Sequence, residues 1–139
     1  RHDRARLHGD DFDLDAEEVA EGRGALLIAY VDGIPVGCGA VRRIAPAVAE
    51  IKRMYVAPSA RSRGVGRQIL NELEAIARQL GAARLVLETG IRQPEARALY
   101  TRVGFTEIPI FGDYARTPHP ELSLCMAKDL LAVAAHHNS

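Results

Sequence analysis

The sequence has no tryptophan, only two cysteines and no net charge. Lysine and arginine together number 18, as do aspartate and glutamate, so the chain presents no overall field that would attract nucleic acid or anionic lipid. The lack of tryptophan and of aromatic-rich basic strands also disfavours a nucleic-acid-binding module. No apolar run approaches the roughly 20 residues that a membrane-spanning helix needs. We therefore expect neither nucleic acid nor a membrane as a partner.

The two cysteines, Cys38 and Cys125, lie far apart in apolar, strand-like runs. This placement is typical of buried thiols rather than of a disulfide or a metal pair. No two of the histidines have the spacing of metal ligands, so we expect no metal. No secretory signal is visible, and the cysteine usage fits a reducing, cytoplasmic location.

A chain of 139 residues is long enough for one domain with its own core, and we expect a single domain over residues 1–139. The polar, acidic start, residues 1–24, predicts a loop and a short helix. We expect this start to be truncated or partly ordered. Residues 131–139 lack hydrophobic periodicity and are expected to form a tail.

Three apolar runs, at residues 25–31, 35–41 and 49–56, predict strands. Asp32 and Gly33 separate the first two runs and are a strong signal for a tight hairpin turn. The start of the domain is therefore expected to be an antiparallel sheet.

A helix follows, because apolar residues recur at steps of three and four between residues 65 and 80, and Gly81 closes it. The apolar run 84–89 predicts a strand parallel to its predecessor, since a helix joins the two. A second helix is predicted from Pro94 to Gly104. Two further strands are predicted at residues 105–110 and 121–126.

The most informative segment is the turn between the third strand and the first helix. The spacing Arg61-x-x-Gly64-x-Gly66 leaves backbone N–H groups at a helix start with no side chain in front of them. Such a helix start carries unpaired donors and the positive end of the helix dipole, which suit a phosphate or pyrophosphate. The predicted phosphate-binding residues are Arg61, Ser62, Arg63, Gly64, Val65, Gly66 and Arg67. An ordinary strand–helix turn with surface arginines is the alternative.

Two other phosphate-binding motifs are excluded by the same segment. A nucleotide P-loop needs GxxxxGK followed by serine or threonine, and the chain contains no such run. A dinucleotide fingerprint needs a third small residue three positions after Gly66, where Ile69 stands.

Three separated segments, RMYVAP, RSRGVGRQIL and ARALYTRVGF, occur in register and resemble the GNAT superfamily of acyl-CoA N-acyltransferases. The resemblance covers about residues 25 to 130. It implies an α/β fold with a mixed central β-sheet flanked by helices, antiparallel in its N-terminal part and with a parallel strand–helix–strand cofactor cleft. It also implies acetyl-CoA as cosubstrate, with its pyrophosphate on the predicted turn, and a homodimer as the default assembly.

The resemblance assigns roles to two further positions. Tyr100, four residues before the Gly-Phe pair, would face the sulfur of acetyl-CoA and assist the leaving thiolate. Gln93 stands where many members carry asparagine, and its amide would contact the pantetheine arm. For Tyr100 the alternative is a core tyrosine whose hydroxyl finds a backbone partner.

Acetyl transfer to an amine requires that the amine lose a proton, because a free alkyl ammonium has a pKa near ~10.4. Glu50 and Glu88 lie on otherwise apolar strands that would line the cleft. The resemblance supports either glutamate as the base. A salt bridge with a neighbouring arginine or lysine is the alternative for each, and deprotonation through water is a third route. A bulge before Pro58 would free a backbone N–H near Tyr55 or Val56 to polarise the carbonyl.

We interpret the chain as an acetyl-CoA-dependent N-acetyltransferase in which a primary amine of a small molecule attacks the thioester directly. Asp113 and Tyr114, in the polar loop before the last strand, would line the acceptor entrance and favour a small cation. Two alternatives stay open: a non-catalytic acyl-CoA-binding or regulatory domain, and a protein or peptide N-acetyltransferase.

Overall fold

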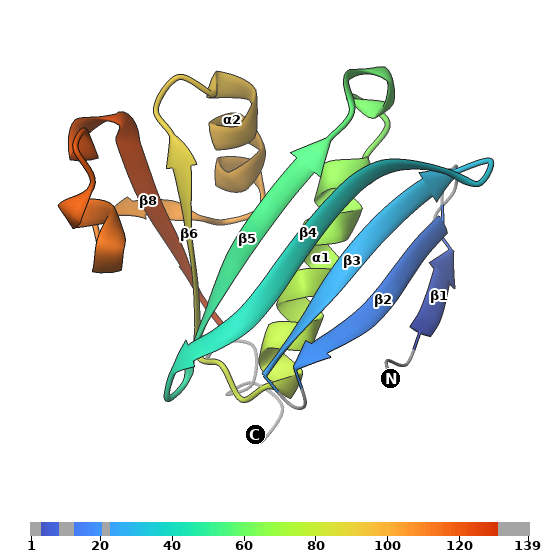
Figure 1. Cartoon of the computed structure of the whole chain (residues 1–139), viewed down its shortest axis with the longest axis horizontal. Coiled ribbons are helices and arrows are strands. Elements are labelled where there is room, and N and C mark those ends of the chain that lie inside the picture. Colours follow the sequence, from blue (N-terminus) through green and yellow to red (C-terminus); the bar gives the residue numbers. More distant parts are fainter. Residues whose placement is uncertain (1–3, 9–12, 21–22, 131–139) are drawn as a thin grey trace.

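The computed structural model describes residues 4–8, 13–20 and 23–130 (Figure 1), with side chains from residue 23 onward. The described residues form one eight-stranded sheet in the order β1-β2-β3-β4-β5-β6-β8-β7. The strands are β1 (Arg4–His8), β2 (Asp13–Ala20), β3 (Gly24–Val31), β4 (Ile34–Ala45), β5 (Val48–Val56), β6 (Arg84–Gly90), β7 (Thr106–Ile108) and β8 (Ser123–Asp129). The expected tail, residues 131–139, lies outside the described residues.

The sheet is antiparallel from β1 to β5 and contains one parallel pair, β5 with β6. The predicted hairpin at Asp32 and Gly33 is present, with φ of 50° and 80°. A two-residue turn of this kind needs positive φ at both positions, which Asp and Gly tolerate. The predicted mixed sheet, antiparallel first and parallel across a strand–helix–strand unit, is confirmed.

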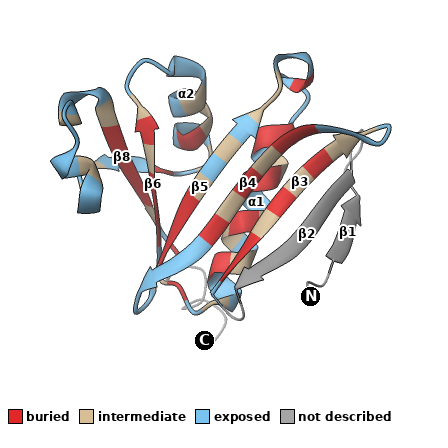
Figure 2. Cartoon of the chain, viewed as in Figure 1, coloured by how far each residue is buried: buried red, intermediate tan, exposed pale blue. Residues whose placement is uncertain are grey.

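Two helices connect the last strands: α1 (Val65–Gln79) joins β5 to β6, and α2 (Pro94–Arg102) follows β6. Helix α1 lies across β3, β4 and β5 on one face of the sheet (Figure 1). Its apolar stripe, which includes Ile69 and Leu73, packs with Leu27 and Leu85 into the core shown in red in Figure 2. Gly39 permits the close approach, because a Cβ at this position would lie 2.8 Å from Ile69 Cγ2.

The prediction of a loop and a short helix for residues 1–24 was wrong. Residues 13–20 form strand β2, which pairs antiparallel with β3, and residues 4–8 form β1 beside it. The segment Leu14-Asp15-Ala16-Glu17 alternates apolar and polar residues, as a strand requires. The many acidic residues of this segment made the two-residue alternation hard to recognise as a strand. Pairing with the edge of β3 stabilises the extended conformation of β2.

The last two strands are confirmed with shifted bounds: β7 ends at Ile108 and β8 continues to Asp129. The connection between them contains two 3-10 turns, η2 (Gly112–Arg116) and η3 (Pro120–Leu122). No helix in the described part of the chain is long and apolar enough to cross a membrane.

Candidate active site

Strands β5 and β6 part at their carboxyl ends and open a cleft. They pair only from Val48 opposite Arg84 to Ile51 opposite Leu87, although both strands continue further. Where parallel strands separate in this way, ligands bind in the crevice outside their carboxyl ends. The cavity measures about 210 Å³. It is lined by Ile51, Lys52, Arg53, Met54, Leu87, Glu88, Thr89, Gly90, Gln93, Ala96 and Tyr100.

The backbone of β5 is irregular beside this cavity. The register with β4 shifts between the pairs Cys38–Tyr55 and Ala40–Lys52, so that Arg53 and Met54 lie opposite a single residue. Arg53 has φ of 58°, a left-handed conformation that marks the bulge. The bulge was expected just before Pro58, near Tyr55 and Val56. It lies earlier in the strand, because the sequence signal of Pro58 marks the strand end and not the bulge.

The turn before α1 has the geometry of an anion site. Gly64 precedes the helix with φ of 80°, Ser62 has φ of 69°, and no side chain caps the helix. Within the described part of the chain, the backbone N–H groups of residues 62–67 have no hydrogen-bond acceptor. Arg61 Nε donates to the carbonyl oxygen of Val56 at 3.2 Å, which ties the turn to the end of β5.

Two glycines of this turn have different surroundings. A Cβ at Gly64 would meet nothing within 4 Å, so this side of the turn is open. A Cβ at Gly66 would lie 2.8 Å from Leu99 Cδ2 and 3.3 Å from Val56 Cγ2. Gly66 is therefore required for close packing of α1 against α2 and β5, and a side chain there would disturb the core as well as the turn.

Arg63 and Arg67 are exposed at this helix start, so substitutions at these positions test the predicted phosphate site without disturbing the core. If the resemblance places the pyrophosphate of coenzyme A correctly, we expect Arg63→Glu and Arg67→Glu each to weaken coenzyme A binding by about tenfold, because a carboxylate would replace a cation beside the predicted pyrophosphate position. Isothermal titration at low and moderate salt measures this, and the loss should shrink as salt rises. Arg102→Glu, an equally exposed reversal elsewhere, is the control. Equal affinities for all three variants would contradict the assignment.

Glu50 is buried, with 4% of its surface exposed, on the sheet face opposite α1. The Tyr114 hydroxyl donates a hydrogen bond of 2.8 Å to Glu50 Oε2, and Arg42 Nη2 lies 3.7 Å from Oε1. The alternative considered for Glu50, an ion pair with Arg42, is thus present. Both carboxylate oxygens already have partners.

Glu88 lies on the cavity wall, and within the described residues no lysine, arginine or histidine nitrogen lies within 4 Å of its carboxylate. The salt bridges considered with Arg92 or Arg97 do not form. Burial raises the pKa of Tyr100, Tyr114 and Cys125, and the charge of Glu88 raises each further. Glu88 is therefore close to three other titratable groups.

Tyr100 projects from α2 and lines the cavity while only 5% of its surface is exposed. Its ring packs edge-to-face with Phe105, with 6.0 Å between centroids. Burial and, to a smaller extent, the charge of Glu88 raise the pKa of Tyr100 to about 12. The phenol is consequently protonated at neutral pH and can donate a hydrogen bond.

The other predicted residues are divided between the cavity and its surroundings. Gln93 precedes the first turn of α2 and lines the cavity. Asp113 is almost fully exposed and pairs with Arg116 at 3.2 Å, and it is not a cavity residue. Tyr114 contacts Glu50, as described, and Phe111 packs edge-to-face against its ring, with centroids 5.4 Å apart.

Sequence reasoning missed two cavity cations, Lys52 and Arg53. Lys52 Nζ lies 5.7 Å from the centroid of the Tyr114 ring, within range of a cation–π contact. Strand alternation from Glu50 could have placed Lys52 on the same face. The position of Arg53 depends on the bulge and had no sequence signal.

Comparison with known proteins shows the family to which the chain belongs. The model of the acetyltransferase (GNAT) family matches residues 2–105. An IAA acetyltransferase of Azospirillum brasilense is 40% identical over 118 residues, which cover 84% of this chain and 75% of that protein. The uncharacterized N-acetyltransferase YsnE of Bacillus subtilis is 36% identical over 96 residues, covering 68% of this chain and 62% of that protein.

A solved structure from Klebsiella pneumoniae, assigned as an acyl-CoA N-acyltransferase, is similar in fold as well as in sequence. It superposes with a TM-score of 0.72 at 39% identity, covering 81% of this chain and 76% of that one. The family model, the relatives and this structure agree with the resemblance found in the three motifs. The chain belongs to the GNAT family of acetyltransferases.

Proposed function

We propose that this acetyltransferase transfers an acetyl group from acetyl-CoA to the primary amine of a small molecule. The observation that carries the proposal is the cleft between β5 and β6, with Glu88 and Tyr100 on its wall and an uncapped helix start beyond the end of β5. Acetyl-CoA supplies an activated thioester. The N–H groups of residues 62–67 would hold its pyrophosphate, and Gln93 would contact its arm.

The acceptor nitrogen attacks the thioester carbonyl, and a proton must leave the amine before or during the attack. We propose that Glu88 is the base that accepts this proton, because its carboxylate lines the cavity and has no cation within 4 Å in the described residues. Glu50 is assigned a supporting role, since Tyr114 and Arg42 occupy its oxygens.

The Tyr100 hydroxyl would stabilise the departing thiolate. A phenol whose pKa is raised to about 12 stays protonated over the working pH range. Complete proton transfer from this phenol to a thiolate would be unfavourable, because thiols are stronger acids; the thiol of free cysteine, for example, has a pKa of about 8.5. We therefore propose that Tyr100 donates a hydrogen bond to the sulfur rather than its proton.

Direct attack, without an acetylated enzyme, is supported by the state of the thiols. Cys125 is 1% exposed, and burial raises its pKa, with the charge of Glu88 raising it further. Burial also raises the pKa of Cys38, against an opposing effect of Arg53. A thiol nucleophile requires a lowered pKa, so neither cysteine suits that role.

A small acceptor is supported by the size and cover of the site. The cavity of about 210 Å³ is smaller than the pockets of about 300–1,000 Å³ that hold drug-sized ligands. The loop that carries Tyr114 is joined to Glu50 across the sheet face opposite α1. Both features leave little room for a peptide backbone beside the reacting atoms.

The decisive experiment measures coenzyme A release from acetyl-CoA over a panel of small amines, amino acids, aminoglycosides and basic peptides. Turnover of small amines, with product mass increased by one acetyl group, is the expected result. Turnover of peptides alone would favour a peptide N-acetyltransferase. Tight coenzyme A binding without turnover of any acceptor would favour an acyl-CoA-binding or regulatory domain.

A further inference from the structure

Opposite charges stand on the two sides of the cleft where β5 and β6 begin to part. Ile51 and Leu87 are the last paired residues of the two strands and are both buried in the core. Because side chains alternate along a strand, the next residues, Lys52 and Glu88, both turn toward the face opposite α1. A cation therefore follows the paired part of β5, and a carboxylate follows that of β6.

These two side chains do not pair with each other. No contact between Lys52 Nζ and the Glu88 carboxylate reaches 4 Å in the described structure. Lys52 instead lies over the Tyr114 ring, which is held in place by the hydrogen bond from its hydroxyl to Glu50. The separation of the strands and this aromatic contact keep the cation and the carboxylate apart.

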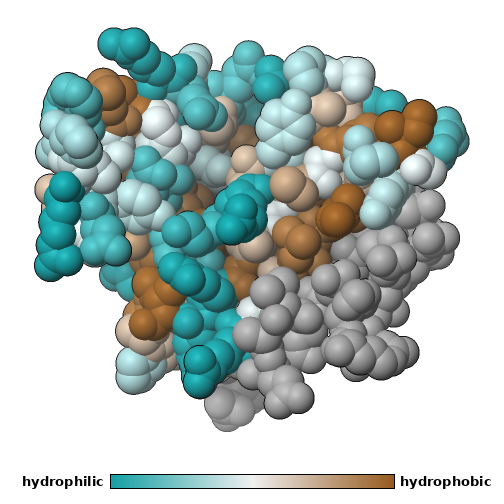
Figure 3. All heavy atoms as spheres, viewed as in Figure 1, coloured by the Kyte–Doolittle hydropathy of each residue, from teal (hydrophilic) through white to brown (hydrophobic). Residues whose placement is uncertain are grey.

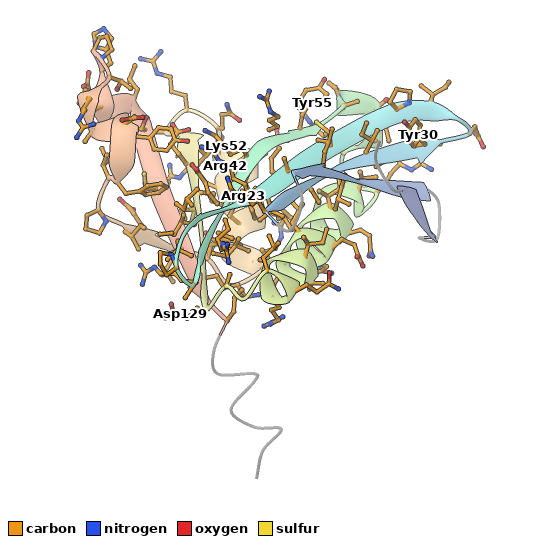
Figure 4. All side chains as sticks on the ribbon, turned by 60° about the horizontal axis from the view of Figure 1, so that its bottom comes forward. Arg23, Tyr30, Arg42, Lys52, Tyr55 and Asp129 are labelled. Atoms are coloured by element: carbon orange, nitrogen blue, oxygen red, sulfur yellow. The ribbon has the colours of Figure 1, made fainter. Side chains whose placement is uncertain are left out.

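Among the described residues that line the cavity, Lys52, Arg53 and Glu88 are the charged ones. Glu50 is buried beneath Tyr114 and Arg42, whereas Lys52 and Arg53 both line the cavity. Figure 4 shows Arg42 and Lys52 close together on the sheet face away from α1. Residues over the β5 and β6 end of this face are mostly hydrophilic, while hydrophobic ones gather over β3 and β4 (Figure 3). An acceptor that carried positive charge alone would meet repulsion from Lys52 and Arg53.

We propose that the acceptor is an amino acid or a close analogue, with an amine and a carboxylate on the same or adjacent carbon atoms. Its amine would lie at Glu88, which accepts the proton, and its carboxylate would bind Lys52. Neighbouring strands are about 4.8 Å apart. β5 and β6 have this spacing at their last pair, Ile51 with Leu87, and they separate beyond it, so a short zwitterion would suit the gap between the two side chains that follow. The proposal rests on the proposed amine acetylation and names the acceptor class of that same site.

The experiment compares matched acceptors that differ only in the carboxylate: leucine, leucinamide and 3-methylbutylamine, and the same series built on phenylalanine. We expect kcat/KM for the amino acid to exceed that of its amide and of its plain amine by about tenfold or more, mainly through KM, because a charge-assisted contact is lost. All rates are measured at one pH and divided by the fraction of each acceptor that is present as the free amine, because the amino groups of the three acceptors differ in pKa.

Variants of Lys52 assign the preference to this side chain. Lys52→Met should abolish the advantage of the amino acid and improve the plain amine a few-fold, because the repelling cation is gone. Lys52→Arg should retain the advantage, and Arg102→Gln, an exposed cation elsewhere, should leave it intact. Thermal melting of each variant verifies the fold.

The outcomes separate this inference from the function on which it rests. If plain amines, amides and amino acids are acetylated equally well, or if Lys52→Met keeps the preference, the zwitterionic acceptor is wrong and the amine N-acetyltransferase stands. If no acceptor in either series releases coenzyme A, the proposed function fails first. Calorimetric binding of leucine to the enzyme with coenzyme A, lost in Lys52→Met, would support the contact without turnover.

Discussion

Tyr100→Phe should lower kcat by roughly 10²-fold or more while acetyl-CoA affinity changes little. The substitution removes one hydroxyl from the cavity wall and keeps the ring that packs against Phe105. The leaving thiolate would then lose its hydrogen-bond donor, which affects the transition state and not the bound ground state. Single-turnover kinetics and calorimetric titration with acetyl-CoA measure the two effects separately.

The competing interpretation makes Tyr100 a core residue only, and it predicts the opposite pattern. In that case Tyr100→Phe would retain kcat and change only the midpoint of thermal unfolding. Tyr30→Phe, on β3 and outside the cavity lining, is the matched control and should change neither kcat nor the affinity for acetyl-CoA. Because the pKa of Tyr100 is raised to about 12, its phenol should add no alkaline limb to the pH–rate profile below that value.

The parts of the fold that depend on local signals were predicted from the sequence. The turn at Asp32 and Gly33 and the helix α1 are each encoded within a short stretch, by positive-φ residues in one case and a 3.6-residue period in the other. Strand β2 was missed because its conformation depends on pairing with β3, and its acidic residues disfavour a strand by composition alone.

The candidate site shows the same division. The uncapped start of α1 could be found from the glycine spacing, since backbone donors at a helix start need no distant partner. The hydrogen-bond partner of Glu50 could not be found from the sequence, because Tyr114 lies 64 positions away in the chain and reaches Glu50 only through the folded loop. The opposition of Lys52 and Glu88 follows from the register of β5 with β6, which no local pattern specifies.

Glu88→Gln should lower kcat/KM at pH 7 by roughly 10²- to 10⁴-fold, the range typical of a lost general base. The rate of this variant should then rise with pH toward the pKa of the acceptor's amine, which is about 10.4 for a plain alkyl amine and lower for an α-amine, because solvent removes the proton that Glu88 no longer accepts. Glutamine keeps the shape of the side chain. If the substitution weakened acceptor or acetyl-CoA binding instead, the loss would appear in calorimetric titration and would not recover with rising pH.

Glu50→Gln is the matched control, since it makes the same change one strand away. Its amide oxygen can still accept the hydrogen bond from Tyr114, so we expect a smaller loss of turnover and the pH–rate profile of the parent. If Glu50→Gln alone showed recovery at high pH, the two carboxylates would have exchanged roles. If both variants kept the parent profile, neither glutamate would be the base, and a water molecule or an already neutral amine would have to account for the proton.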